Sequence, residues 1–144
     1  MQNEFEMQKK YSIKLGREII GFSYLKGNDA SMGAVLGKIH FENISSGYDF
    51  FSKYCYEHNV PTDENDSEDK FISTQTIDGL TVINEAEIEI KGIGVCVTGF
   101  ENEFEIDIFG IPYPFYGEEF PHHVKMGENH YRKIAGELSQ SKSK

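Results

Sequence analysis

The chain has 144 residues, of which 24 are acidic and 14 are basic, so its formal net charge is −10. This length suits one domain with its own core, and we expect residues 1–144 to form it, with mobile ends at 1–9 and 139–144. The negative charge disfavours binding to nucleic acid and to anionic membranes, because both present phosphates that bind Lys and Arg. It favours a basic protein as the partner.

The two cysteines, Cys55 and Cys96, show neither CxxC nor zinc-type spacing. We expect both to be free, buried thiols, which suits a reducing compartment. No apolar run approaches the length of a transmembrane helix, and residues 1–10 do not read as a signal peptide. We therefore expect a cytoplasmic protein, a monomer or a small homo-oligomer, that does not bind a membrane.

The N-terminal part of the chain favours β-strands. Residues 11–15 alternate weakly between apolar and polar side chains, and residues 18–25 are rich in residues that favour strands. Lys26-Gly27-Asn28-Asp29 predicts a turn, since Gly and Asn accept positive φ. Residues 34–42 then predict a third strand.

Residues 46–59 predict the clearest helix. Ser46 can cap its first turn, with Asp49 three residues later as in a capping box. Pro61 prevents the helix from continuing. One apolar stripe at spacings of three and four is expected to pack on a sheet. It consists of Tyr48, Phe51, Tyr54, Cys55 and His58.

Residues 62–70 contain five carboxylates and no apolar side chain, which predicts a solvated loop. The loop lacks the Gly and Glu that an EF-hand needs at its sixth and twelfth positions. After it, residues 71–77 and 80–83 predict two strands. They flank Asp78-Gly79, a pair that favours a two-residue hairpin turn.

Acidic residues alternate with apolar residues in two further segments. Residues 85–90 and 103–109 predict strands whose exposed faces are almost purely acidic, and residues 93–98 predict a strand between them. The apolar parity changes at Lys91-Gly92, so we expect a turn or a bulge there. Like charges along a sheet repel each other, so this face suggests a cationic partner. The expected contact charges are Glu85, Glu87, Glu89, Glu103, Glu105 and Asp107.

Residues 110–117 hold two prolines and three aromatic residues between two glycines, and cannot lie inside a sheet. We favour the interpretation that these rings cover one end of the core. The alternative is an exposed rim, in which Tyr113, Phe115 and Tyr116 anchor a partner. Residues 124–138 then predict a second helix.

The sequence contains no motif for nucleophilic catalysis, for phosphate binding or for a zinc site. We expect no enzymatic activity, no cofactor and no metal. The alternative function is a small ligand-binding or metal-dependent hydrolase domain. It would use residues 111–120 with His122 and His123, next to acidic residues and His130.

In general organisation the chain resembles the immunity proteins that bacteria carry against polymorphic or contact-delivered toxins. The supporting segments are Gly33–Phe41, Tyr48–Cys55 and Ile111–His123. The resemblance implies that the protein binds and neutralises a cognate toxin, for example a nuclease, whose basic surface would suit an acidic inhibitor. The fold that we predict is α+β: an antiparallel β-meander sheet with two packed helices.

Overall fold

Alternating burial along the strands produces two antiparallel sheets that share one core. The computed structural model describes residues 8–124 and confirms the α+β fold class, although the strands form two sheets instead of one meander. The four-stranded sheet has the order β5 (His40–Phe41), β2 (Glu18–Ser23), β1 (Tyr11–Leu15), β8 (Leu80–Ile83). The six-stranded sheet has the order β3 (Gly27–Asp29), β4 (Ala34–Lys38), β10 (Glu103–Phe109), β9 (Gly94–Phe100), β7 (Phe71–Thr74), β6 (Thr62–Asp66).

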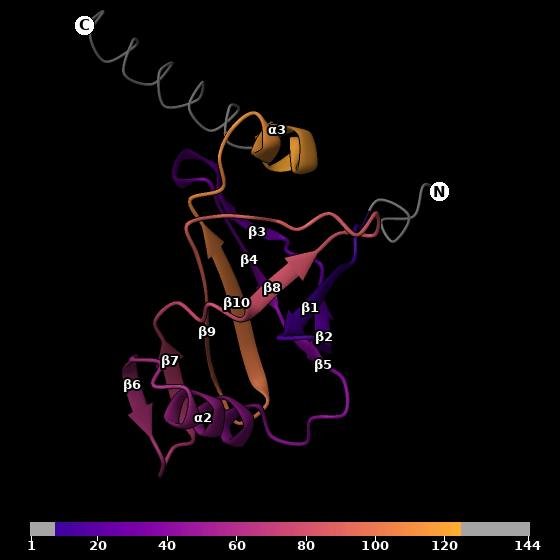
Figure 1. Ribbon diagram of the computed structural model, residues 1–144. Helices are drawn as coiled ribbons and strands as arrows, with labels where there is room; N and C mark the ends of the chain where they lie inside the picture. Colours follow the sequence, from indigo (N-terminus) through magenta and orange to yellow (C-terminus); the bar gives the residue numbers. More distant parts are fainter. Residues whose placement is uncertain (1–7, 125–144) are drawn as a thin grey trace, which may run out of the picture.

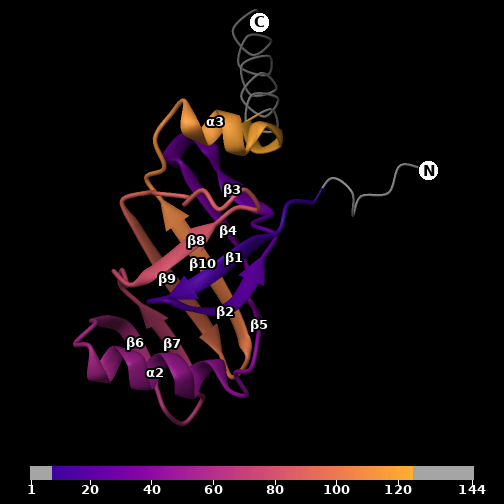
Figure 2. The ribbon, with the colours of Figure 1, turned by 45° about the vertical axis from the view of Figure 1, so that its right-hand side comes forward.

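The elements form layers on one side of the six-stranded sheet. Figures 1 and 2 show the four-stranded sheet crossing that side, with helix α2 (Gly47–Glu57) at one end and helix α3 (Phe115–Glu119) at the other. The 3-10 helix η1 (Ala30–Met32) joins β3 to β4. Within residues 8–124, no helix or strand packs on the opposite side of this sheet.

Helix α2 begins as its sequence predicts, and Tyr48, Phe51 and Cys55 of the predicted stripe are buried, but His58 is exposed and follows the last helical residue. The Ser46 side chain accepts a hydrogen bond from the backbone N–H of Asp49 at 3.2 Å. Phe51 is fully buried, and its ring lies 5.4 Å from that of Phe104 on β10. Burying one such ring contributes roughly 1.5–3 kcal/mol, so this contact ties the helix to the six-stranded sheet.

The predicted hairpin around Asp78-Gly79 is wrong. β7 pairs with β6 and β9, whereas β8 pairs with β1 in the other sheet. A turn does form, since the Leu80 N–H donates to the Ile77 carbonyl at 3.1 Å. It carries the chain from one sheet to the other instead of joining two paired strands.

The predicted loop at 62–70 is also partly wrong, because residues 62–66 form the edge strand β6. This strand contacts α2 through side-chain hydrogen bonds, since its own residues are all polar. The Asn65 side chain accepts a hydrogen bond from the Tyr48 hydroxyl and donates one to Ser52, both on α2. This edge strand is therefore anchored to the helix through side-chain hydrogen bonds.

The second predicted helix, at 124–138, lies outside the described residues except for Val124, which is helical together with residues 121–123. The expected mobile ends also lie outside them, apart from residues 8 and 9. Lys9 forms an ion pair with Glu119 at 3.5 Å. Within residues 8–124, no helix is both long enough and apolar enough to span a membrane.

Candidate protein-binding face

The uncovered side of the six-stranded sheet carries most of the acidic strand residues. Cross-strand register assigns alternate side chains of each strand to this side. We call the resulting surface the acidic face. It consists of Leu36, Lys38, Glu64, Asp66, Phe71, Ser73, Cys96, Thr98, Phe100, Glu103, Glu105 and Asp107.

The alternation predicted for β10 is confirmed. Phe104, Ile106 and Ile108 are buried in the core, while Glu103 and Glu105 are exposed on the acidic face. Lys38 lies opposite Glu105 in the register, and its Nζ is 3.4 Å from a Glu103 carboxylate oxygen. Both side chains of this ion pair are well exposed, so the pair contributes little to stability. The face keeps its negative character around this lysine.

Asp107 lies between Leu36 on β4 and Cys96 on β9. Its Oδ1 is buried and has no hydrogen-bond partner among the described residues. Burial raises the pKa of this carboxyl group, because the low-dielectric surroundings disfavour the charged form. Burying the charged carboxylate of Asp107 thus lowers the stability of the fold, in contrast to its exposed neighbours on β10.

Both cysteines are free, as predicted, but only Cys55 is buried; Cys96 is half-buried on the acidic face. Burial, and then the charges of Asp107 and Asp63, raise the pKa of the Cys96 thiol. A raised pKa keeps the thiol protonated, and the thiolate is the reactive form. Cys96 therefore lacks the environment of a nucleophile.

The other predicted acidic strand does not form. Glu85, Glu87 and Glu89 lie in and after a turn, in which Asn84 Oδ1 accepts hydrogen bonds from the N–H groups of Ala86 and Ile88, both at 2.9 Å. Glu87 has a φ of 64°, which no regular strand contains. Hydrogen bonds to the Asn84 side chain thus stabilise a turn where the sequence predicts the backbone pairing of a strand. This segment adjoins β8, so the six predicted contact charges do not form one patch.

The parity change at Lys91-Gly92 has a simple structural cause. The Ile90 N–H donates to Val82 in the four-stranded sheet at 2.8 Å, and the Ile93 N–H donates to Phe109 in the six-stranded sheet at 2.8 Å. The chain therefore changes sheets between these residues, and the buried parity changes with it.

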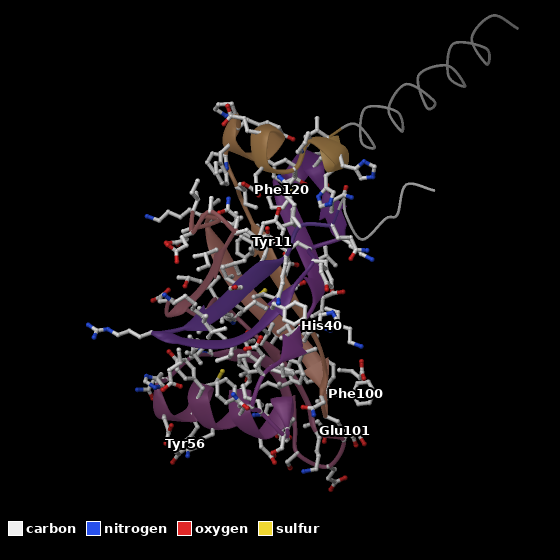
Figure 3. The ribbon with its side chains drawn as sticks, turned by 90° about the vertical axis from the view of Figure 1, so that its right-hand side faces the viewer. Tyr11, His40, Tyr56, Phe100, Glu101 and Phe120 are labelled. Atoms are coloured by element: carbon white, nitrogen blue, oxygen red, sulfur yellow. The ribbon has the colours of Figure 1, made fainter. Side chains whose placement is uncertain are left out.

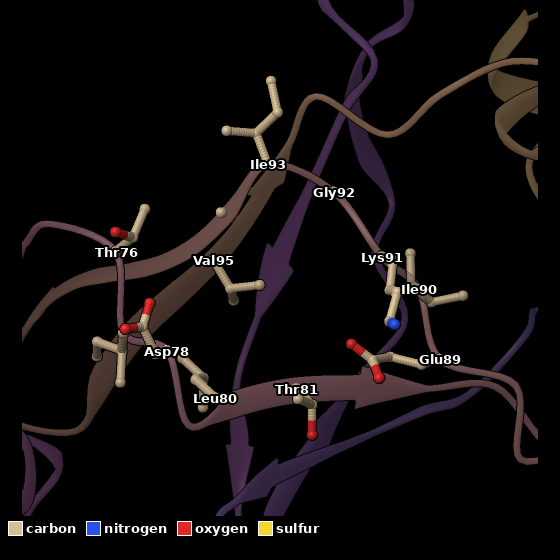
Figure 4. Close-up of a pocket in the computed structure, with 12 residues that line it drawn as sticks. Thr76, Asp78, Leu80, Thr81, Glu89, Ile90, Lys91, Gly92, Ile93 and Val95 are labelled. Carbon is tan, nitrogen blue, oxygen red and sulfur yellow. The ribbon is translucent and has the colours of Figure 1, made fainter.

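A small cavity lies at this crossing (Figure 4). Its volume is about 130 Å³, and its lining mixes Asp78 and Glu89 with Lys91 and apolar side chains. Small-molecule sites usually measure about 300 Å³ or more. The size and the mixed charge do not favour a ligand site here.

The aromatic segment at residues 110–117 mainly covers one end of the core, which is the interpretation that we favoured from the sequence. Tyr116 is fully buried, and its hydroxyl donates to the Ala34 carbonyl at 2.9 Å. Burial raises the pKa of this phenol to about 12. Phe115 is half-buried, and Tyr113 is 54% exposed. Of the three predicted anchors, only Tyr113 is well exposed, and Tyr116 is not accessible to a partner.

The two adjacent histidines differ in their surroundings. His122 is exposed, while His123 is buried with its ring stacked 5.4 Å from that of Phe120. Burial, and then His122, lower the pKa of His123. Within residues 8–124, no three His, Cys, Asp or Glu side chains are grouped to hold a metal ion, and His130 lies outside that range.

Glu119 has a structural position that the sequence did not suggest. Its carboxylate accepts hydrogen bonds from the Tyr11 hydroxyl and the Asn84 side chain, both at 2.9 Å. Burial and the hydrogen bond to Glu119 raise the pKa of Tyr11. These contacts join α3 to the region of the four-stranded sheet, so Glu119 has a packing role here.

Sequence reasoning missed Phe71 and Phe100, which pair across β7 and β9 on the acidic face. Phe100 is 51% exposed and projects away from the sheet beside Glu101 (Figure 3). The only sequence signal for these two exposed rings was their position in the alternation of inward and outward residues along each strand. Comparison with family models, with curated proteins and with solved structures found no match to this chain.

Proposed function

We propose that this chain is a cytoplasmic immunity-type inhibitor that binds a basic bacterial toxin domain through its acidic face. The observation that carries the proposal is an open sheet face on which five carboxylates accompany one lysine. A predominantly negative face that no helix or strand within residues 8–124 covers favours a partner of opposite charge.

The composition of the face suits protein recognition. Exposed Glu103 and Glu105 would steer a basic surface, while the half-exposed ring of Phe100 supplies apolar contact area. In such interfaces, charges at the edge mainly raise the association rate, and aromatic side chains contribute more of the affinity. A stoichiometric inhibitor needs both properties.

The alternative function, a metal-dependent hydrolase or a ligand-binding domain, receives no support from the geometry. It calls for a concave site containing His122 or His123. His122 is exposed, His123 packs on Phe120, and neither lines the cavity near Lys91.

The proposal is tested with the product of the adjacent gene. The C-terminal domain of that product is expressed in bacteria with and without this chain, and growth and complex formation are measured. We expect the domain to stop growth alone, and the chain to restore growth and form a stable one-to-one complex. A domain that leaves growth unchanged, or a toxic domain that this chain neither binds nor neutralises, contradicts the proposal.

A further inference from the structure

A hollow lies at one corner of the acidic face, where the β6–β7 turn meets the β9–β10 turn. Its volume is about 530 Å³, which is enough for a long side chain of a partner. We call it the aromatic–acid hollow. It is lined by Glu64, Asp66, Glu68, Asp69, Phe71, Phe100 and Glu101.

Backbone contacts hold the walls of the hollow in place. The Glu101 N–H donates to the Lys70 carbonyl at 3.0 Å and so joins the two turns. Asp66 Oδ1 accepts hydrogen bonds from the N–H groups of Glu68 at 2.9 Å and Asp69 at 3.2 Å. Because these hydrogen bonds order the backbone of both turns and the Asp66 side chain, the positions of the lining residues are set before a ligand binds.

The lining contains five carboxylates and no cationic side chain. The nearest lysine in sequence, Lys70, is directed to α2: its Nζ lies 3.9 Å from Asp49 and 5.9 Å from the centre of the Tyr48 ring. Within residues 8–124, no lysine or arginine lines the hollow to balance its negative charge.

Two phenylalanine rings lie among these carboxylates. Phe71 and Phe100 are directly opposite each other in the β7–β9 register, and Phe100 is half-exposed. The face of an aromatic ring attracts a cation within about 6 Å of its centre. A guanidinium group can stack on a ring while its N–H groups bind carboxylates as a fork, and an ammonium group lacks this geometry.

We propose that the aromatic–acid hollow binds an arginine side chain of the basic partner protein. This inference rests on the proposed function and names the group that the acidic face would recognise. The arginine would stack on Phe100 and donate hydrogen bonds to the surrounding carboxylates.

The test uses a short Gly-Arg repeat peptide as the probe, with the same peptide carrying lysine or uncharged citrulline as references. Amide chemical shifts of the chain are followed by NMR during titration at physiological ionic strength. We expect shifts centred on residues 64–71 and 100–101. The affinity should fall in the order arginine, lysine, citrulline.

Two variants with equal charge separate the hollow from the overall charge. E64Q/E68Q/E101Q removes three lining carboxylates, and E85Q/E87Q/E89Q removes three from the turn after β8. We expect the first variant to weaken arginine-peptide binding at least about fivefold and the second less than about twofold. Phe100→Leu, which keeps an apolar side chain, should weaken binding about two- to fivefold.

Equal weakening by the two triple variants, or shifts centred away from the hollow, would overturn the inference. Circular dichroism establishes that each variant is folded. A partner that still binds through Glu103 and Glu105 while E64Q/E68Q/E101Q has no effect would refute the hollow but leave the proposed function. Peptide binding at the hollow, with no partner on the acidic face, would refute the proposed function instead.

Discussion

The two sheets bury their inner faces against each other, but their outer faces differ in charge. On the six-stranded sheet the outward strand positions include Glu64, Asp66, Glu103, Glu105 and Asp107. On the four-stranded sheet they are Ser12, Lys14, Ile19, Phe22, His40, Thr81 and Ile83, with no carboxylate among them. One carboxylate from outside the strands, Glu89, lies opposite Ile83 through an isolated bridge.

A second lysine adds to this contrast, because Lys10 Nζ lies 4.2 Å from the centre of the outward Phe22 ring. The net charge of −10 is thus unevenly placed over the strands. An uneven field orients a charged partner as well as attracting it, so the acidic face should meet a basic protein first. The difference in charge between the two outer faces therefore indicates where a basic protein would bind, which the total charge does not.

The largest expected effect concerns two phenylalanines of one hairpin that lie on opposite sides of the six-stranded sheet. Phe104 is 2% exposed and contacts the rings of Phe41 and Phe51, whereas Phe100 is half-exposed. Phe104→Ala should lower the free energy of unfolding by about 3–5 kcal/mol. Phe100→Ala should lower it by less than about 1 kcal/mol. Urea denaturation measures both, and similar losses would contradict the assigned faces.

The second prediction compares charges on the two outer faces. Reversing Glu103 and Glu105 to Lys should slow association with the basic partner about tenfold at low salt, and should weaken its salt dependence. Reversing Lys10 and Lys14 to Glu should leave the rate unchanged or slightly raise it. Stopped-flow mixing measures the rates. An equal and opposite response of the two variants would mean that net charge, not the acidic face, controls association.

The helix at 46–59 and the strand at 103–109 were predictable because their signals are local. Ser46 caps the helix through its own hydroxyl, and alternation along β10 directly reflects one buried face. The acidic side chains of β10 on the candidate face could therefore be identified from the sequence alone.

The errors arose where long-range contacts or one side chain decide the structure. Asp78-Gly79 does favour a turn, but the sequence does not show that the flanking strands enter different sheets. Residues 62–66 form a strand by pairing with β7, and Asn65 attaches it to α2 through side-chain hydrogen bonds. Between residues 84 and 88, the Asn84 side chain holds a turn in a segment whose alternation predicts a strand. The hollow at Phe71 and Phe100 depends on three strands meeting, so no local pattern shows it.

A smaller effect concerns Asp107, the half-buried carboxylate of the acidic face. Because burial raises its pKa in the folded state above the reference value of 3.8, folding is penalised as pH rises through the folded pKa. Asp107→Asn should therefore raise stability at pH 7, by less than about 1 kcal/mol or a few degrees in Tm. The gain should vanish below pH ~3.8. Thermal denaturation at both pH values measures it, and a gain at acid pH alone would contradict this account.

The smallest effect concerns His123, on the side away from the acidic face. Its pKa is lowered in the folded state, so its contribution to stability is complete above the unfolded pKa of about 6.5 and is lost as pH falls below it. His123→Phe should reduce the loss of stability between neutral and mildly acidic pH. Chemical denaturation across this range provides the measurement, and an unchanged pH dependence would show that His123 titrates normally.

The binding surface is tested most directly by methyl NMR of the chain in complex with the basic toxin domain that we propose as its partner. Leu36 and Thr98 report on the acidic face, and Thr81 and Ile83 report on the outer face of the four-stranded sheet. We expect the methyl signals of Leu36 and Thr98 to shift on binding, while those of Thr81 and Ile83 stay in place. Shifts at Thr81 and Ile83, with Leu36 and Thr98 unchanged, would contradict the assignment of the acidic face as the binding surface.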